Sequence, residues 1–140
     1  MSLQVQKVSQ AEELDQVFAV RNVVFVHEQN CPPELEWEYE DESTHFLATI
    51  NGRPVGACRW RKTEKGYKLE RFAVLKEFRK HGVGRALIAE ALSDLPKNAK
   101  YIYLHSQLSA TSLYAKFGFI SEGEAFEEAG IMHYKMVKAV

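Results

Sequence analysis

A short basic segment with two glycines contains the residues best suited to binding an anion. Residues 72–75 form an apolar run that predicts a strand, and residues 79–84, Arg-Lys-His-Gly-Val-Gly, then lead into a predicted helix. The first N–H groups of a helix have no intrahelical acceptor, and the positive end of the helix dipole lies there. Because Gly82 and Gly84 carry no side chains, phosphate oxygens can approach these N–H groups closely. The segment therefore predicts a diphosphate site.

Two other nucleotide-binding loops fit this segment less well. A Walker-type loop requires a Lys-Ser/Thr pair after its last glycine, whereas Arg85 and Ala86 follow Gly84. A Rossmann fingerprint requires three glycines and an acidic residue near the end of the next strand, and this turn has only two glycines. Taken alone, the segment fits an ordinary strand-to-helix turn about equally well.

Length and composition predict one soluble globular domain that spans residues 1–140. Hydrophobic residues make up 46% and charged residues 26% of the chain, and the net charge is −1. This near-neutral balance provides no bulk field for nucleic acid or for an anionic membrane, so neither is expected as a partner. With no recognisable signal peptide and no apolar run long enough to span a bilayer, the expected location is cytoplasmic.

The cysteines and histidines show no metal-ligand spacing, so no metal is expected. Cys31 and Cys58 are 27 residues apart, and the five histidines are at least 18 residues from one another. Free thiols in a reducing compartment are the simplest interpretation of the two cysteines.

Hydrophobic periodicity predicts elements in the order βαβββαβαββ, an α/β (α+β) fold with a mixed central sheet of about six or seven strands flanked by helices. A capping box at residues 9–12 opens the first helix, whose apolar positions recur up to Phe25, and Asn51-Gly52 predicts a hairpin. Two later helices are expected at residues 82–95 and 110–117. The strands are expected at residues 3–8, 45–50, 55–62, 67–75, 101–106, 119–124 and 131–137.

A second motif follows about 30 residues downstream of the glycines: Tyr114, three residues, and then Gly118-Phe119. Residues 79–84 resemble the R/Q-x-x-G-x-G/A pyrophosphate loop of the GNAT N-acetyltransferase superfamily, and the phrase that begins at Tyr114 resembles its second motif. Over nearly its full length the chain resembles the small bacterial ElaA/YjcF-like group of that superfamily. The matching segments are residues 21–29, 44–47, 104–107 and 126–133.

The resemblance implies a GNAT fold in which the strand before the pyrophosphate loop splays from its parallel neighbour, with the pantetheine arm of acetyl-CoA in the gap. Backbone groups of residues 72–74 would pair with that arm, and the Val74 N–H would polarise the thioester carbonyl. Loop N–H groups, assisted by Arg79, Lys80 and Arg85, would bind the diphosphate. The cofactor-binding residues implied in this way are Phe72, Ala73, Val74, Arg79, Lys80, His81, Gly82, Val83, Gly84, Arg85, Ser112 and Phe117.

For catalysis, the resemblance implies direct attack of a primary amine on acetyl-CoA, with Tyr114 as the general acid for the departing thiolate. The alternative is a tyrosine whose ring only packs. Some family members carry a glutamate as general base at the position that Ile102 occupies here. Glu70 is another candidate base because strand alternation places it on the same side as Phe72 and Val74, although an outward salt-bridging residue fits at least as well.

Other polar residues are weaker candidates for the cleft. His45, His105 and Gln107 lie at strand starts or ends, where a lone histidine is more often structural. Acidic residues at 34–42 and 122–128 would draw a cationic amine toward the site if they lined it, although a solvated acidic surface explains them as well.

Two functions therefore stay open. The first is an acetyl-CoA-dependent N-acetyltransferase that acts on the amine of a small molecule or peptide. The second is an acyl-CoA-binding module of the same fold without turnover, which the missing glutamate at Ile102 favours. The resemblance is also compatible with a homodimer.

Overall fold

One mixed sheet forms the centre of the fold in the computed structural model, which describes residues 2–29 and 42–138. The strand order is β1-β2-β3-β4-β5-β7-β6, and neighbouring strands are antiparallel except β4 and β5, which are parallel. This arrangement confirms the expected mixed sheet and gives it seven strands. They are β1 (Leu3–Val8), β2 (Ser43–Ile50), β3 (Arg53–Lys62), β4 (Tyr67–Val74), β5 (Ile102–Gln107), β6 (Phe119–Glu128) and β7 (Ile131–Lys138).

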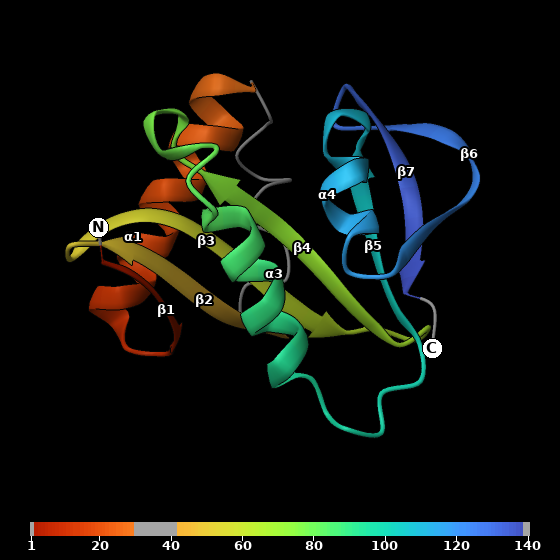
Figure 1. The fold of residues 1–140 in the computed structure, drawn as a ribbon, viewed down its shortest axis with the longest axis horizontal. Coiled ribbons are helices and arrows are strands. Elements are labelled where there is room, and N and C mark those ends of the chain that lie inside the picture. The colour runs from red at the N-terminus through yellow and green to blue at the C-terminus, as the bar shows by residue number, and fades with distance from the viewer. Residues whose placement is uncertain (1, 30–41, 139–140) are drawn as a thin grey trace.

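Helices cover both faces of this sheet (Figure 1). On one face α1 continues without a break into the π-helical segment η1, and on the other face α3 crosses the strands between β2 and β4. The short helix α4 packs beside β5 and β6. The helical elements are α1 (Ala11–Arg21), η1 (Asn22–Glu28), the 3₁₀ turn η3 (Lys76–Phe78), α3 (Val83–Asp94), the 3₁₀ turn η4 (Leu108–Ala110) and α4 (Thr111–Ala115).

Each face of the sheet has its own apolar core because successive strand residues point to opposite faces. Leu69 and Leu87 are fully buried in the core under α3, and Val17 is fully buried in the core under α1. A β-carbon at Gly56 would lie 2.8 Å from a methyl group of Val83. Glycine at this strand position therefore allows α3 to pack close to β3.

Three local features differ from the expectation. The capping box at residues 9–12 does not form, since α1 is capped at Gln10 without a side-chain hydrogen bond. The helical pattern that continues to Phe25 changes from α to π geometry at Asn22. The strand expected to end at residue 124 runs on to Glu128, because pairing with β7 resumes after an irregularity around Gly123, whose φ is 80°.

The buried face of α3 gives a direct test of this packing. Leu87→Ala removes a fully buried side chain and leaves a cavity, so it should lower the free energy of unfolding by about 2–5 kcal/mol in urea titrations. Glu90→Ala, on the exposed side of the same helix, should change it by less than about 0.5 kcal/mol. A loss below about 0.5 kcal/mol in Leu87→Ala would contradict the packing of α3 on the sheet.

Candidate active site

The two parallel strands at the centre of the sheet separate after a short paired stretch. β4 and β5 pair only from Tyr67 to Leu69 on one strand and from Ile102 to Leu104 on the other, and Figure 1 shows them diverging beyond that point. This splayed pair is the arrangement that the sequence resemblance implies. The backbone groups of β4 after Leu69 therefore line a gap in the sheet.

Val74 presents its backbone N–H to this gap. The next residue, Leu75, donates its N–H to the Val55 carbonyl on the β3 side at 2.9 Å. Because successive N–H groups of a strand point to opposite edges, the N–H of Val74 points away from β3. Its carbonyl, on the same edge, accepts a hydrogen bond of 3.0 Å from Nε of Arg79.

A β-bulge in β4 changes which side chains share a face. Two residues of β4, Arg71 and Phe72, lie opposite the single residue Cys58 of β3, and Arg71 has a φ of 59°. Leu69 and Phe72 consequently both face the α3 core, so Glu70 faces the α1 side. The expectation that Glu70 shares a side with Phe72 and Val74 is therefore wrong, because it assumed unbroken alternation.

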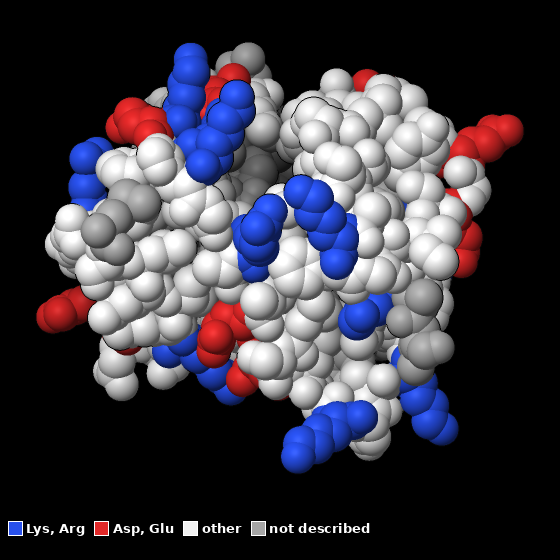
Figure 2. Space-filling model, in the orientation of Figure 1, with Lys and Arg blue, Asp and Glu red and all other residues white. Residues whose placement is uncertain are grey.

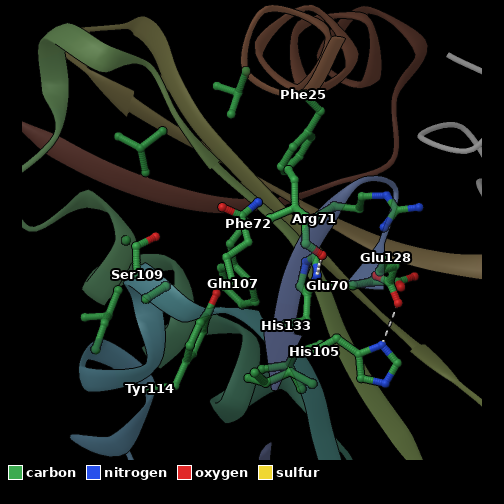
Figure 3. A pocket seen from close by; sticks show the side chains of 18 of the residues that line it. Phe25, Glu70, Arg71, Phe72, His105, Gln107, Ser109, Tyr114, Glu128 and His133 are labelled. Atoms are coloured by element: carbon green, nitrogen blue, oxygen red, sulfur yellow. Dashed lines mark hydrogen bonds and ion pairs between the residues drawn. The ribbon is translucent and has the colours of Figure 1, made fainter. Parts of the chain in front are cut away.

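The gap opens into a cavity of about 570 Å³ that reaches both faces of the sheet. Gly84, Ile88 and Tyr114 line it from the α3 and α4 side. Phe25 of η1 lines it from the α1 side. Figure 3 shows these walls, with Tyr114 entering from α4 and Phe72 from β4 near the centre.

Tyr114 lies at this cavity with only 7% of its surface exposed. Its ring makes edge contacts with Phe72 and Phe119, at centroid distances of 5.6 and 6.2 Å. Burial, with a smaller effect from Cys58, raises the pKa of the Tyr114 hydroxyl well above its usual value. The side chain therefore holds its proton at neutral pH and could act as a proton donor but not as a base.

The predicted pyrophosphate loop has the geometry of an anion site at the start of α3. Lys80 and Gly82 both have positive φ, 69° and 81°, and Gly82 caps the helix. The Ala86 N–H donates to the carbonyl of the N-cap residue Gly82 at 3.0 Å, and this is the hydrogen bond that begins the helix. The N–H groups that precede Ala86 in the first turn thus need other acceptors. Figure 2 shows Lys and Arg side chains to the upper left of the hollow near the start of α3 and below it.

Arg79 is less available to a phosphate than its position in the motif suggests. Its two terminal nitrogens donate to the two carboxylate oxygens of Glu28, each at 2.8 Å. The hydrogen bond from Arg79 lowers the pKa of Glu28, which keeps that carboxylate charged. The pair ties η1 to the loop, and Lys80 and Arg85 remain as exposed cations nearby.

The other residues predicted to contact acetyl-CoA differ in burial and in their distance from the cavity. The Val83 side chain is buried in the α3 core, so only its backbone could reach a phosphate. His81 is exposed on the loop, Ser112 is exposed on α4, and the partly buried Phe117 packs against the core. These three are not among the residues that line the cavity, and their contacts with acetyl-CoA stay predictions.

Glu70 is enclosed by cations, which makes it a poor general base. It pairs with Arg59 at 2.7 Å, Arg61 at 2.7 Å and Lys68 at 3.3 Å. Burial alone would raise the pKa of Glu70, but the Coulombic attraction of Arg59 and the other cations outweighs it and lowers the pKa to about 2. A carboxylate with so low a pKa has little tendency to remove a proton from an amine. The geometry thus favours a structural role for Glu70.

Polar residues of β5, β6 and β7 line the α1 side of the cavity. His105 Nδ1 lies 2.9 Å from Oε2 of Glu128, His133 Nδ1 lies 2.7 Å from the Ile131 carbonyl, and Gln107 donates to Gln29 at 3.0 Å. His105 and Gln107, which the sequence offers only as weaker candidates, therefore do line the cavity. His45, by contrast, is buried against Phe18 away from the cavity.

The sequence indicates Glu128 only as one member of an acidic cluster, and it does not indicate His133 as a cavity residue. Both belong to the segment 126–133 that matches the family, so a signal was present. Of the acidic residues at 122–128, only Glu128 lines the cavity; Glu122, Glu124 and Glu127 are exposed outside it. Cys31 and the acidic residues 34–41 lie outside the described residues.

The described residues add two further observations. In residues 2–29 and 42–138, no three His, Cys, Asp or Glu side chains group so as to hold a metal ion. None of the helices in these stretches is long and apolar enough to cross a membrane. Cys58 is a free thiol in the core, and burial raises its pKa well above the ordinary value, which makes it unreactive.

A mixed sheet whose parallel pair opens beside a helix N-terminus defines the acyl-CoA N-acyltransferase class of fold, and comparison with known proteins agrees. The model of the acetyltransferase (GNAT) domain family matches residues 7–140. The chain is 43% identical over 132 residues to YjcF of Bacillus subtilis (strain 168), an uncharacterized N-acetyltransferase, which covers 91% of this chain and 93% of that protein.

Two solved structures superpose over almost the whole chain. Escherichia coli ElaA has a TM-score of 0.84 and 26% identity, covering 99% of this chain and 100% of that one. A GNAT acetyltransferase from Elizabethkingia anophelis, solved with acetyl-CoA bound, has a TM-score of 0.71 and 18% identity, covering 99% and 98%. The chain belongs to the GNAT acetyltransferase family, within the small bacterial ElaA/YjcF-like group.

The structural role of Glu70 predicts a pH-dependent stability. Its pKa is about 2 in the folded protein against an ordinary value of 4.5, so its stabilising contribution is complete above pH 4.5 and is lost as the pH falls toward 2. Each unit of pKa difference corresponds to about 1.4 kcal/mol, which makes that contribution about 3 kcal/mol. Glu70→Gln also leaves Arg59 buried beside a neutral group, so the loss at pH 7 should be about 3–5 kcal/mol.

Urea unfolding between pH 7 and pH 2 measures this effect. The difference between wild type and Glu70→Gln should shrink as the pH falls from 4.5 toward 2, because the Glu70 carboxyl of the unfolded chain takes up a proton in that range while the folded protein still keeps it ionised. Glu122→Gln, which disrupts an exposed pair with Lys135, should cost less than about 1 kcal/mol at any pH. A cost for Glu70→Gln that stays constant down to pH 2 would contradict the ion-pair account.

Proposed function

We propose that this protein is an N-acetyltransferase that moves the acetyl group of acetyl-CoA to a primary amine by direct attack. The main observation behind the proposal is that three groups lie at one cavity. These are the inward-facing N–H of Val74, the hydroxyl of Tyr114 and the N-terminus of α3. The whole chain, residues 1–140, would act as a single domain of this kind.

The gap between β4 and β5 suits the pantetheine arm. Its amide groups can take the hydrogen bonds that β5 does not supply to β4 beyond Leu69, in the manner of an added strand. In this position the thioester carbonyl would lie near the Val74 N–H, which stabilises the oxyanion as the amine adds. The acetyl-CoA bound in the related Elizabethkingia anophelis protein supports acetyl-CoA as the acyl donor.

The start of α3 suits the diphosphate of the same molecule. Its unbonded N–H groups and the helix dipole attract the anion, and Gly84 leaves room beside Leu113, whose nearest carbon would lie 3.4 Å from an added β-carbon. Lys80 and Arg85 supply positive charge at the surface. Arg79 would contribute chiefly by holding the loop, through Glu28 and the Val74 carbonyl.

Tyr114 is the proposed proton donor to sulfur. As the amine nitrogen bonds to the thioester carbon and the C–S bond breaks, the thiolate takes the proton of the Tyr114 hydroxyl. Burial raises the pKa of Tyr114, and it would also raise the pKa of a CoA thiol in the same cavity. Because the phenolate and the thiolate are both destabilised, proton transfer from Tyr114 to sulfur stays feasible. No covalent acetyl-enzyme is needed, which agrees with the inert, buried Cys58.

The second candidate is an acyl-CoA-binding module without turnover. It is favoured by the two candidate base positions, since Ile102 stands where some family members carry a glutamate and Glu70 is held charged by its cations. A screen of primary amines with acetyl-CoA, followed by free thiol release, separates the two. Turnover with any amine supports the enzyme, and binding of acetyl-CoA with no turnover supports the module.

Binding of the diphosphate can be tested at Gly84. Gly84→Asp places bulk and negative charge at the start of α3, beside the proposed phosphate, and should abolish acetyl-CoA binding in calorimetry while the protein stays folded. Ala89→Asp adds the same group on the exposed side of α3 and should leave the affinity unchanged. Equal affinity in Gly84→Asp and wild type would place the diphosphate elsewhere.

The proton-donor role can be tested with Tyr114→Phe, which keeps the ring and removes only the hydroxyl. Because general acid catalysis contributes about 10²–10⁴-fold, kcat should fall at least about tenfold, with the affinity for acetyl-CoA little changed. Tyr134→Phe, at a partly buried ring away from the cavity, is the matched control and should keep its activity. Comparable kcat in Tyr114→Phe and wild type would remove Tyr114 from the mechanism.

A further inference from the structure

One imidazole on the α1 side of the cavity is oriented by a carboxylate. His105 is the first residue of β5 beyond its last pair with β4, so it stands where the gap begins. Its Nδ1 lies 2.9 Å from Oε2 of Glu128, and Figure 3 shows this contact at the cavity. The hydrogen bond from His105 lowers the pKa of Glu128, so this carboxylate is ionised and can only accept.

This contact fixes the tautomer of the ring. Since Glu128 accepts, Nδ1 of His105 carries the hydrogen, and the lone pair is left on Nε2. Phe126 packs edge-on against the imidazole at a centroid distance of 5.0 Å and restricts its rotation. A base held by a third group in this way is the usual arrangement for activating a nucleophile.

His105 and Tyr114 approach the gap from opposite faces of the sheet. Leu104 points into the α3 core together with Tyr114, so the neighbouring His105 points to the α1 face. Gln107, two residues further on the same face, bonds to Gln29 directly after η1, which agrees with this direction. An amine arriving from the α1 side would meet His105, while the thioester sulfur would lie toward Tyr114.

We propose that His105 is the general base of the acetyl transfer and that Glu128 positions it. This assignment rests on the proposed function. Nε2 of His105 removes a proton from the ammonium group of the acceptor. The freed nitrogen lone pair then bonds to the thioester carbon, the C–S bond breaks, and Tyr114 gives its own proton to sulfur. The second proton on nitrogen restores the Tyr114 hydroxyl, which leaves the amide, the CoA thiol and a protonated His105.

The two other candidates fit this role less well. Nδ1 of His133 donates to a neutral backbone carbonyl, that of Ile131, which stabilises a protonated ring less than a carboxylate does. His133 is also only 8% exposed and lies stacked on Phe126. Glu70 is held by its three cations.

The kinetic test compares two nucleophiles at neutral pH with acetyl-CoA as donor: n-butylamine, which is an ammonium ion there, and methoxyamine, which is uncharged. His105→Gln should lower kcat/KM for n-butylamine about 10²–10⁴-fold, and for methoxyamine much less, because that nucleophile has no ammonium proton to lose. The affinity for acetyl-CoA should not change. His27→Gln, whose ring bonds to Asn22 outside the cavity, is the matched control.

Glu128→Gln separates positioning from catalysis. It keeps the shape of the side chain and should lower kcat/KM for n-butylamine at least about tenfold, again with less effect on methoxyamine; it also carries the test if His105→Gln fails to fold. Equal losses with both nucleophiles, or no loss, would overturn the role of His105 while leaving the proposed function standing. No turnover by wild type with acetyl-CoA bound would overturn both.

A spectroscopic measurement does not depend on the acceptor. Two-bond ¹H–¹⁵N correlation spectra of the histidine rings should show His105 with its hydrogen on Nδ1 and a bare Nε2. Glu128→Gln should change this pattern at His105 and leave His27 as it is. The opposite tautomer at His105 in wild type would overturn the assignment.

Discussion

The early end of pairing between β4 and β5 is the constraint on which the site depends. Three residue pairs hold the two strands together, and beyond Leu69 and Leu104 the sheet divides. Buried backbone N–H and C=O groups require partners, so the free edge of β4 calls for a ligand with amide groups at the spacing of a strand. The pantetheine arm of acetyl-CoA has this chemistry, and in the proposed function the same division would allow an amine to reach the thioester from the opposite face.

The structure near the gap is arranged to keep it open. The bulge at Arg71 and Phe72 strengthens the local twist of β4 and turns Phe72 and Val74 toward the α3 side. Glu70 anchors the other side through its buried pair with Arg59 and its contacts with Arg61 and Lys68. At the far end, Arg79 connects the carbonyl of Val74 to Glu28 of η1, so the loop, the strand edge and the α1-side helix are held together.

Local patterns predicted most of the elements, including the start of α3 where the anion site is proposed. Period-two alternation located the strands, and the glycines at 82 and 84 located the start of α3, because each depends on residues close in sequence. The bulge could not be predicted this way, since the extra residue in β4 exists only relative to its partner Cys58 in β3. Strand alternation without this bulge places Glu70 on the same face as Phe72, the α3 face of the sheet, whereas its side chain faces α1.

Contacts between residues that are distant in sequence could not be predicted from local patterns either. Glu28 and Arg79 are 51 residues apart, and His105 and Glu128 are 23 apart. The first pair forms because η1 packs against β4, next to the loop that carries Arg79, and the second forms because β6 lies beyond β7 from the end of β5. The sequence alone could name His105 as polar and near a strand end, but the carboxylate that orients it appears only when the hairpin of β6 and β7 is folded.

Amide hydrogen exchange followed by NMR measures whether the edge of β4 at Val74 receives acetyl-CoA. The N–H of Leu75 already donates to Val55 at 2.9 Å and should exchange slowly with or without ligand. The N–H of Val74 should exchange quickly in the free protein and become strongly protected, with a downfield shift, when acetyl-CoA saturates the site. Unchanged exchange at Val74 in a sample that calorimetry shows to be saturated would contradict the account.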